Sequence, residues 1–258
     1  QGIVTWALAV GKHHNIDYLR VGKTPGLLLK LKYKIADKLI FSKVKNTIGI
    51  ENANLLPTAG AKLSDEIAMF MRSIGVPITY GYGLTESTAT VCCYDYVDYE
   101  IGTVGSIMPS VYVKIGEENE ILLKGKTIFP GYYKNPEATK EAFTEDGWFR
   151  TGDAGYIKDN KIVLTERIKD LFKTSNGKYI APQAIETRLS LDKYIEQIAV
   201  IGDERNFVSA IIAPSIPAIE EFAVKNKIKY DSLDELIAHS AVYALIEGRI
   251  NELQKGMA

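Results

Sequence analysis

The sequence has few cysteines, no long apolar run and almost no excess charge, and each of these absences excludes a class of protein. The two cysteines, Cys92 and Cys93, are adjacent, so they provide neither a disulfide framework nor the spacing of metal ligands. A chain without such a framework is typical of the reducing cytoplasm. No apolar stretch approaches the roughly 20 residues of a membrane-spanning helix. The formal net charge of -1 argues against a surface that binds nucleic acid by neutralising phosphates.

Two short segments resemble phosphate-binding loops but are incomplete. Residues 22–24 and 125–127 both read Gly-Lys-Thr, the end of a P-loop. The glycine that this motif requires five positions earlier is Asp17 in the first case and Glu120 in the second. The sequence also has no Gly-x-Ser-x-Gly nucleophile motif, and its histidines form no metal-binding pattern. Neither segment therefore predicts a phosphate site.

What the sequence does contain is typical of a globular protein, with 46% apolar and 24% charged residues in a chain of 258. Residues 27–46 alternate apolar side chains with lysines, which predicts an amphipathic surface helix with Leu31, Ile35, Leu39 and Ile40 on one face. The alternative for this basic helix is a role on a membrane surface.

Residues 55–80 predict a strand, a helix and a second strand. The first strand ends at Pro57, Ser64 can cap the helix, and residues 76–80 form the next strand. Asp65 and Glu66 would lie in the first helical turn, where carboxylates suit the helix dipole. A strand–helix–strand unit of this kind predicts a right-handed crossover and a parallel sheet, and therefore an α/β fold.

The remainder of the chain shows two further patterns. Residues 101–165 are rich in short β segments, including 111–115, 120–123 and a hairpin that turns at Asp159-Asn160. The pattern changes again close to Lys169, where we expect a domain boundary. The elements predicted beyond it are helices at 183–189, 217–226 and 240–255, and strands at 198–201 and 208–213.

A glycine-rich loop, Tyr80-Gly81-Tyr82-Gly83-Leu84-Thr85-Glu86, follows the second predicted strand directly. In α/β folds ligands bind at the carboxyl edge of the sheet, where such a loop would lie. Its glycines allow the backbone to approach a ligand, and an aromatic ring can stack on a base. Thr85 offers a hydroxyl to a phosphate, and Glu86 offers an oxygen to Mg²⁺. The alternative is a glycine-rich turn with a helix-capping threonine.

Two more motifs follow this loop in order. Thr151-Gly152-Asp153 places a carboxylate in a short loop, after a glycine that permits a tight turn, and residues 166–170 read Glu-Arg-Ile-Lys-Asp. The set resembles the adenylate-forming superfamily, which includes acyl-CoA synthetases, peptide-synthetase adenylation domains and firefly luciferase. This resemblance implies the carboxyl-terminal part of a large α/β AMP-binding domain in residues 1–168. Within it, residues 101–165 would form a small β-barrel-like subdomain, and residues 169–258 would form a smaller, mobile and incomplete α+β domain.

The resemblance also implies a nucleotide site. The stretch Tyr82, Gly83, Thr85 and Glu86 would hold adenine, phosphate and Mg²⁺, with Thr85 and Glu86 catalytic and Glu86 the metal ligand. The turn Gly60-Ala61 would form a backbone wall against adenine. Asp153 would accept both ribose hydroxyls, and Arg167 would lie near the ribose and phosphate.

Residues 166–170 lead into residues that the family uses for thioester formation, the second half of its reaction. Lys169 matches the hinge at which the small domain rotates, since a few torsions at an element end can absorb such a motion. Lys173 and Gly177 match positions used in thioester formation, with Gly177 near the incoming thiol. The alternative for Lys173 is a solvated lysine-rich loop. Residues 125–133, which end in Gly-Tyr-Tyr, are interpreted as structural, with the tyrosines packing on the β subdomain.

The loop at residues 173–182 and the segment 36–44 look most like long-chain fatty acyl-CoA synthetases. The implied substrates are a long-chain fatty acid, ATP and CoA, with Mg²⁺, in a cytoplasmic protein that contacts membranes peripherally. The alternatives are an enzyme for another carboxylic acid or for a carrier-protein thiol, and a non-catalytic nucleotide-binding module. The family's phosphate loop and late catalytic lysine have no counterpart among the 258 residues. We therefore expect a carboxyl-terminal portion that is inactive without the rest of the protein.

Overall fold

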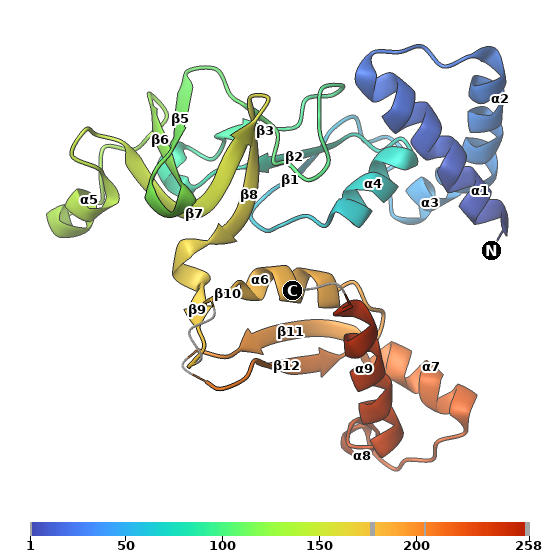
Figure 1. Ribbon diagram of the computed structural model, residues 1–258. Helices are drawn as coiled ribbons and strands as arrows, with labels where there is room; N and C mark the ends of the chain where they lie inside the picture. Colours follow the sequence, from blue (N-terminus) through green and yellow to red (C-terminus); the bar gives the residue numbers. More distant parts are fainter. Residues whose placement is uncertain (1, 176–178, 204, 256–258) are drawn as a thin grey trace. The chain divides into compact units, whose positions relative to one another are not determined.

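The computed structural model describes residues 2–175, 179–203 and 205–255 (Figure 1). The chain divides into two compact units, Gln1–Thr165 and Glu166–Ala258. Each unit has its own buried core, and each is described by itself below. The α/β class predicted from the sequence is confirmed, because helices accompany a large sheet in the first unit.

The first unit is organised around a sheet of eight strands in the order β1-β2-β3-β4-β8-β7-β6-β5. β1 and β2 are parallel, and the pairs beyond them are antiparallel. The strands are β1 (Leu56–Thr58), β2 (Ile78–Tyr82), β3 (Cys92–Cys93), β4 (Ser106–Ile107), β5 (Val111–Ile115), β6 (Glu120–Gly125), β7 (Phe149–Lys158) and β8 (Lys161–Arg167). In the part of the chain that is described, this order does not close on itself. The β-rich residues 101–165 therefore extend the sheet that begins with the parallel pair.

The crossover between β1 and β2 is helix α4 (Asp65–Ser73), as predicted. The Ser64 hydroxyl accepts a hydrogen bond of 3.2 Å from the backbone nitrogen of Ile67, which confirms the predicted cap. Asp65 and Glu66 occupy the first turn, where their charge opposes the helix dipole. This local sequence therefore fixes where the helix begins, and with it the length of the turn that follows β1.

The predicted helix at residues 27–46 forms, and most of the apolar face predicted for it is exposed. The segment consists of α2 (Leu27–Ala36), a π-helical stretch η3 (Asp37–Phe41) and α3 (Ser42–Thr47). Leu31 and Leu39 are exposed by 57% and 41%, whereas Ala36 and Phe41 are fully buried. A π-turn adds one residue to a helical turn and so rotates the side chains that follow it. That rotation brings Phe41 into the core with Ile74.

The other helices of the first unit were not predicted. They are α1 (Gly2–Gly11), its π-helical continuation η1 (Lys12–Tyr18), a short 3₁₀ turn η2 (Leu19–Val21) and α5 (Pro136–Ala142). The predicted hairpin between β7 and β8 is confirmed. Asp159 and Asn160 both have positive φ, 47° and 59°, as a type I′ turn requires. No helix in the described part of the chain is long and apolar enough to cross a membrane.

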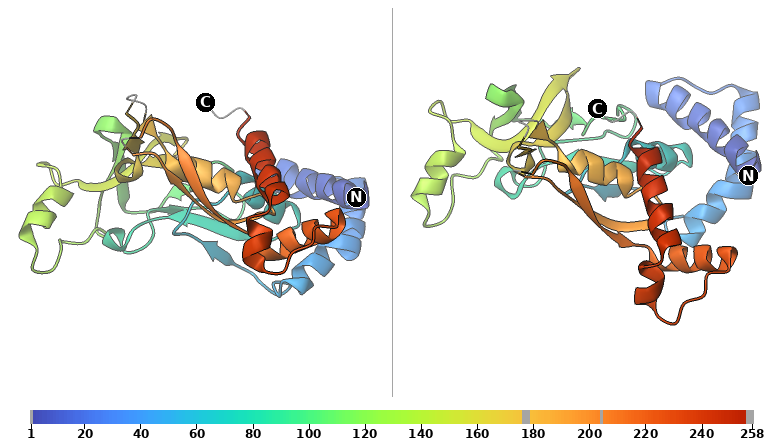
Figure 2. Two further views of the ribbon diagram at one scale, coloured as in Figure 1. Left: turned by 90° about the horizontal axis from the view of Figure 1, so that it is seen from below. Right: turned by 60° about the horizontal axis from the view of Figure 1, so that its bottom comes forward.

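The second unit contains a β-hairpin accompanied by helices (Figures 1 and 2). Its elements are the short pair β9 (Phe172–Lys173) and β10 (Tyr179–Ile180), then α6 (Pro182–Leu189), β11 (Ile195–Ile201), β12 (Ser209–Pro214), α7 (Ile216–Asn226), α8 (Leu233–Ile237) and α9 (Ser240–Leu253). Pro182 occupies the first turn of α6, where its missing N–H costs nothing. Helix α6 packs against β11, and Ile219, Leu236 and Val242 form the core of the three later helices.

Candidate functional site

Several of the predicted nucleotide residues lie at the carboxyl ends of β1 and β2. Because these strands are parallel, the turn Gly60-Ala61 after β1 and Tyr82 at the end of β2 lie at the same edge of the sheet. The Tyr80 hydroxyl accepts a hydrogen bond of 3.1 Å from the Leu63 nitrogen and donates one of 3.4 Å to the Ala61 carbonyl. The turn after β1 is therefore fixed to β2 by Tyr80, the first residue of the glycine-rich motif, whose sequence does not suggest this role.

The loop after β2 folds back closely on itself at Gly83. A Cβ atom at this position would lie 1.5 Å from the Ala89 carbonyl oxygen, so no other residue fits there without moving the backbone. A short 3₁₀ turn, η4 (Thr85–Ser87), follows. Ser87, and not Thr85, holds this turn, because its hydroxyl accepts from the Leu84 nitrogen at 2.9 Å. The exposed Thr85 hydroxyl makes no hydrogen bond to the residues that the structure describes.

Tyr82 and Asp153 are directly joined. The Tyr82 hydroxyl donates a hydrogen bond of 2.6 Å to Oδ2 of Asp153, although the two residues are 71 positions apart. Asp153 is only 8% exposed. Burial, followed by the neighbouring Asp153 carboxylate, raises the pKa of Tyr82, so the phenol remains protonated as the donor. The glycine-rich loop after β2 and the Thr-Gly-Asp motif are thus in direct contact.

The Thr-Gly-Asp motif does not form the short loop expected from the sequence. Residues 151–153 lie inside the ten-residue strand β7 as a bulge, since Arg150 pairs with Leu122 while Ala154 pairs with Glu120. The positive φ of Gly152, 71°, explains how extra residues fit within a continuous strand.

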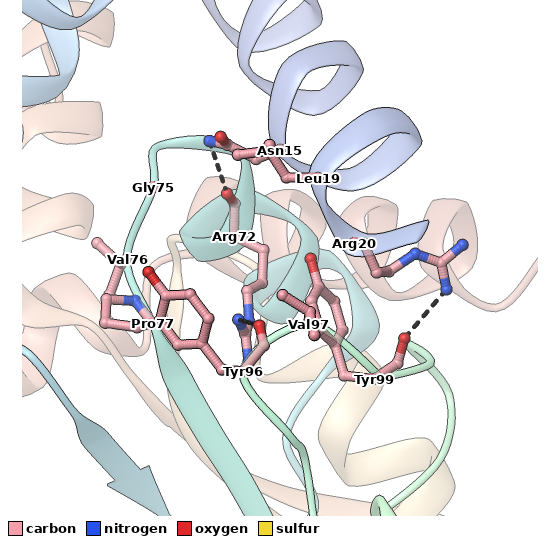
Figure 3. A pocket seen from close by; sticks show the side chains of 10 residues that line it. All are labelled: Asn15, Leu19, Arg20, Arg72, Gly75, Val76, Pro77, Tyr96, Val97 and Tyr99. Carbon is pink, nitrogen blue, oxygen red and sulfur yellow. Dashed lines mark hydrogen bonds between the residues drawn. The ribbon is translucent and has the colours of Figure 1, made fainter. Parts of the chain in front are cut away.

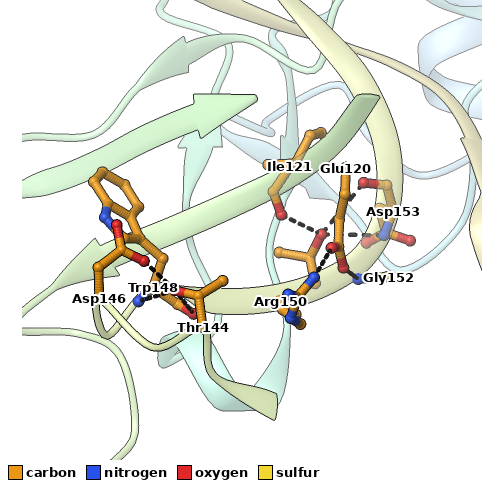
Figure 4. A network of polar contacts seen from close by, with 9 residues as sticks. Glu120, Ile121, Thr144, Asp146, Trp148, Arg150, Gly152 and Asp153 are labelled. Atoms are coloured by element: carbon orange, nitrogen blue, oxygen red, sulfur yellow. Dashed lines mark hydrogen bonds and ion pairs between the residues drawn. The ribbon is translucent and has the colours of Figure 1, made fainter. Parts of the chain in front are cut away.

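Side chains on both strands hold this bulge in place (Figure 4). The Thr151 hydroxyl donates to the Ile121 carbonyl at 2.7 Å and accepts from the Asp153 nitrogen at 3.1 Å. The Glu120 carboxylate accepts from the Gly152 nitrogen at 3.0 Å and pairs with Arg150 at 3.0 Å. The backbone that carries the Asp153 carboxylate is therefore fixed before any ligand binds.

Glu86 is contacted by Phe129 and Tyr132, which belong to a segment predicted from its sequence to be structural. The Tyr132 hydroxyl donates to Oε1 of Glu86 at 2.9 Å, and the Phe129 nitrogen donates to the Glu86 carbonyl at 2.8 Å. Partial burial and this hydrogen bond raise the pKa of Tyr132. Tyr133, in contrast, is 87% exposed. The sequence offered only the Gly-Tyr-Tyr pattern and no sign of which tyrosine touches the loop after β2.

The surroundings of Glu86 fit a magnesium ion bound through phosphates. Oε2 of Glu86 makes no hydrogen bond within the described residues, so it is available as a ligand. No cluster of three or more His, Cys, Asp or Glu residues occurs in that part of the chain. Mg²⁺ is commonly held by one or two carboxylates together with substrate phosphates, and a single carboxylate is compatible with that arrangement.

Arg167 and Lys169 lie at the start of the second unit. Arg167 is the last residue of β8 and is exposed, and Lys169 lies in the short 3₁₀ helix η6 (Ile168–Asp170). Their predicted roles near the ribose and as a hinge involve the first unit, and they stay predictions.

Lys173 lies in β9, opposite Tyr179 of β10. Its side chain is exposed, and its ammonium group is 5.5 Å from the centre of the Tyr179 ring. Gly177 falls outside the described residues. The predicted part of both residues in thioester formation therefore stays a prediction as well.

A small cavity of about 90 Å³ lies elsewhere in the first unit, between η1, α4 and residues 96–99 (Figure 3). Buried Arg72 donates to the carbonyls of Ile78 and Tyr96, at 2.5 Å and 3.1 Å, and its guanidinium lies 3.9 Å from the Tyr99 ring centre. Burial lowers the pKa of this guanidinium. None of the predicted site residues lines the cavity. We interpret Arg72 as a structural tie between α4 and the loop that contains Tyr96.

Comparison with known proteins gives matches along most of the chain. Residues 24–133 match the family described as AMP-binding enzyme, and residues 169–247 match the AMP-binding enzyme C-terminal domain. A long-chain-fatty-acid–CoA ligase of Mycobacterium bovis, FadD15, is 35% identical over 230 residues, which cover 88% of this chain and 38% of that protein. A chloroplastic long-chain-fatty-acid–[acyl-carrier-protein] ligase of Arabidopsis thaliana, AEE15, is 34% identical, covering 78% of this chain and 30% of that protein.

The fold is also found among solved structures. The adenylation domain of a carboxylate reductase from Mycobacterium chelonae aligns with a TM-score of 0.65 and 25% identity, over 97% of this chain and 37% of that structure. The chain thus spans between 30% and 38% of the length of these three proteins. Together with the junction of Tyr82 and Asp153, these matches show that the chain belongs to the adenylate-forming, AMP-binding superfamily and is similar within it to the long-chain fatty acid–CoA ligases.

Proposed function

We propose that the whole protein activates a long-chain fatty acid with ATP and transfers the acyl group to CoA. The similarity to the mycobacterial ligase supports this activity. The observation that carries the proposal for this chain is the hydrogen bond of 2.6 Å from Tyr82 to Asp153. It unites the residues expected to hold adenine and ribose in one place.

The proposed reaction has two steps. In the first, a carboxylate oxygen of the fatty acid attacks the α-phosphorus of ATP and pyrophosphate leaves. In the second, the thiolate of CoA attacks the acyl carbon and AMP leaves with the electron pair of the broken C–O bond. A free carboxylate resists the second step because oxide would have to leave, and AMP replaces oxide as a stable leaving group.

Asp153 is the proposed ribose ligand. A carboxylate can accept hydrogen bonds from both ribose hydroxyls, and the pinned backbone of the bulge keeps Asp153 in position. Tyr82 would contact adenine while its hydroxyl still donates to Asp153. The backbone of the Gly60-Ala61 turn would form the opposite wall, since this turn is tied to β2 through Tyr80.

Phosphate and metal would be held by the loop after β2. Gly83 brings the backbone close, and the exposed Thr85 offers its hydroxyl to a phosphate oxygen. Glu86 would bind Mg²⁺ through Oε2, and the ion would neutralise charge that develops on the phosphates. Arg167 would add a further positive charge. Catalysis of this kind depends mainly on positioning and charge compensation.

The second half-reaction is proposed to use the second unit. Lys169 would serve as the hinge, and Lys173 and Gly177 would then face the acyl-adenylate and the incoming thiol. The support for this assignment is the match of residues 169–247 to the C-terminal domain of AMP-binding enzymes.

We also propose a cytoplasmic protein that touches membranes peripherally. Cys92 and Cys93 are free thiols, which suits a reducing compartment. Leu27, Leu28 and Leu31 of α2 are exposed by 87%, 67% and 57% beside several lysines, a composition that favours an anionic lipid surface.

The second candidate transfers the acyl group to a carrier protein. It is favoured by the similarity to the Arabidopsis ligase, whose name states an acyl-carrier-protein acceptor. Assays with CoA and with a phosphopantetheinylated carrier protein separate the two, because the preferred acceptor gives the higher kcat/KM. Preference for short or aromatic acids would instead indicate a different carboxylic acid. Failure to bind any nucleotide would favour a non-catalytic module.

The test of the proposed site is Asp153→Asn in the whole protein. We expect fatty-acid-dependent exchange between ATP and labelled pyrophosphate to fall at least about 100-fold, because an amide binds the two ribose hydroxyls less well than a carboxylate. Glu145→Gln is the matched control, since Glu145 is an exposed carboxylate of a nearby loop. Equal exchange rates in the two variants would contradict the assignment of Asp153 to the nucleotide site.

A further inference from the structure

The turn that carries Glu86 is fastened to a second segment that comes some 40 residues later in the chain. This fastening segment, Thr127–Tyr132, contacts the turn at three points. The Thr88 hydroxyl donates to the Thr127 carbonyl at 2.6 Å, and the Phe129 nitrogen donates to the Glu86 carbonyl at 2.8 Å. These two contacts hold the backbone at Glu86 and two residues after it.

The third contact acts on the Glu86 carboxylate itself. The Tyr132 hydroxyl donates to Oε1 at 2.9 Å. Within the described residues this is the hydrogen bond that the carboxylate accepts, so the rotation of the carboxylate depends on Tyr132. Oε2 accepts no hydrogen bond from the residues that the structure describes, so it can bind a cation. A hydrogen bond to one carboxylate oxygen that leaves the other free is the usual arrangement around a metal-ligating carboxylate.

Tyr132 is itself held in place by its neighbours. Its backbone nitrogen donates to the Thr139 hydroxyl at 2.9 Å, and its ring meets the Phe129 ring edge-on, with the centres 4.8 Å apart. Phe129 in turn packs on Phe149, a buried residue of β7. The phenol therefore reaches Glu86 from a supported position, and its orientation does not depend on a ligand.

We propose that Tyr132 is a positioning residue that orients the Glu86 carboxylate for magnesium bound to the nucleotide. The inference rests on the proposed function, and it assigns a specific task to a segment whose sequence suggested only packing. Tyr132 touches neither substrate nor reacting atoms in this role. It acts by holding Glu86 in the rotamer that presents Oε2, which reduces the ordering that the metal complex must otherwise impose.

The adjacent tyrosine provides a matched control. Tyr133 is 87% exposed, and its ring centre lies 5.3 Å from the Lys134 ammonium group; among the described residues, the phenol bonded to Glu86 is that of Tyr132. Both Tyr132→Phe and Tyr133→Phe remove a single phenolic oxygen from the same segment. Only the first removes the hydrogen bond to the carboxylate.

The test is isothermal titration of the whole protein with ATP, in magnesium and in EDTA, and with AMP. We expect Tyr132→Phe to weaken binding of magnesium-ATP roughly five- to tenfold, because the metal complex must then order the Glu86 side chain itself. Its affinity for metal-free ATP and for AMP should stay within about twofold. Tyr133→Phe should match the unsubstituted protein in all three titrations. In a Glu86→Gln background, Tyr132→Phe should change nothing further, because the oriented carboxylate is already gone.

Three results would overturn the inference. The first is equal magnesium-ATP affinity in the two phenylalanine variants. The second is an equal loss of AMP and magnesium-ATP binding in Tyr132→Phe, which would indicate that Tyr132 only supports the loop. The third is an additive effect in the Glu86→Gln background. If the unsubstituted protein binds no nucleotide at all, the proposed function itself fails, and that outcome is distinct from the other three.

Discussion

Asp153 is a buried carboxylate with a phenolic donor as its partner. A buried ionised group is costly unless hydrogen bonds compensate for lost hydration. Tyr82 supplies one such bond, and Thr151 and Glu120 fix the adjoining backbone. The site is therefore built by side chains from β2, β6 and β7. The carboxylate itself could be predicted from the Thr-Gly-Asp motif, but Tyr132 could not, because no local pattern links it to Glu86.

The adjacent thiols differ in their environment, which gives a prediction at the scale of single residues. Burial raises the pKa of Cys92 to about 12 and also raises that of Cys93, which is less buried. Only the thiolate reacts readily. At about pH 8 we expect Cys93→Ala to remove one thiol that reacts with an aromatic disulfide reagent in the native protein, whereas Cys92→Ala removes none.

The raised pKa of Cys92 also determines how stability changes with pH. In the unfolded chain the Cys92 thiol ionises near pH 9, whereas in the folded protein its pKa is about 12. The contribution of this thiol to the stability of the folded state is therefore complete below pH 9. Above pH 9 this contribution declines by about 1.4 kcal/mol per pH unit. Rapid labelling of Cys92 in the native protein at about pH 8 would contradict the burial.

Some elements could be predicted from local chemistry and others depend on the whole sheet. The unit β1–α4–β2 and the Asp159-Asn160 hairpin carry their own caps and turn residues, so short-range rules suffice. The bulge in β7 and the π-turn in η3 depend on partners far away in the sequence. Leu39 and Phe41, both within the π-turn, show the consequence, since Leu39 is 41% exposed and Phe41 is fully buried.

The cap of α4 gives a prediction at the scale of one element. Ser64→Ala removes the acceptor for the Ile67 nitrogen and should lower the free energy of unfolding by about 1 kcal/mol. Ser64→Thr keeps an acceptor oxygen and should lose less than half as much. Urea unfolding monitored by circular dichroism provides the comparison. Equal loss in the two variants would mean that the cap contributes little.

At the scale of the whole molecule, the chain forms two compact units, and each buries apolar residues of its own. The first unit contains every proposed residue of the adenine, ribose and metal site except Arg167, and the second contains Lys173 and the hinge position Lys169. The sequence could predict a change of pattern near Lys169. Residue patterns encode the elements within each unit, but they do not encode the backbone torsions at the boundary between the units.

The proposed hinge can be tested through the two half-reactions. Lys169→Pro fixes φ and should slow acyl-CoA formation at least about tenfold, while fatty-acid-dependent pyrophosphate exchange stays within about twofold. Lys169→Ala removes the charge but leaves the torsion free, so it should retain both activities. A proline variant that loses both half-reactions equally would argue against a hinge at this position.

The hydrogen bond between β2 and β7 joins positions 71 residues apart. Closing so large a loop costs entropy before any contact forms, and a partly folded chain has no place for adenosine. A nucleotide that binds only the native state would stabilise that state by mass action and so protect it from unfolding and degradation. Under the proposed function, cellular ATP would then influence how much of the protein survives as well as how fast it works.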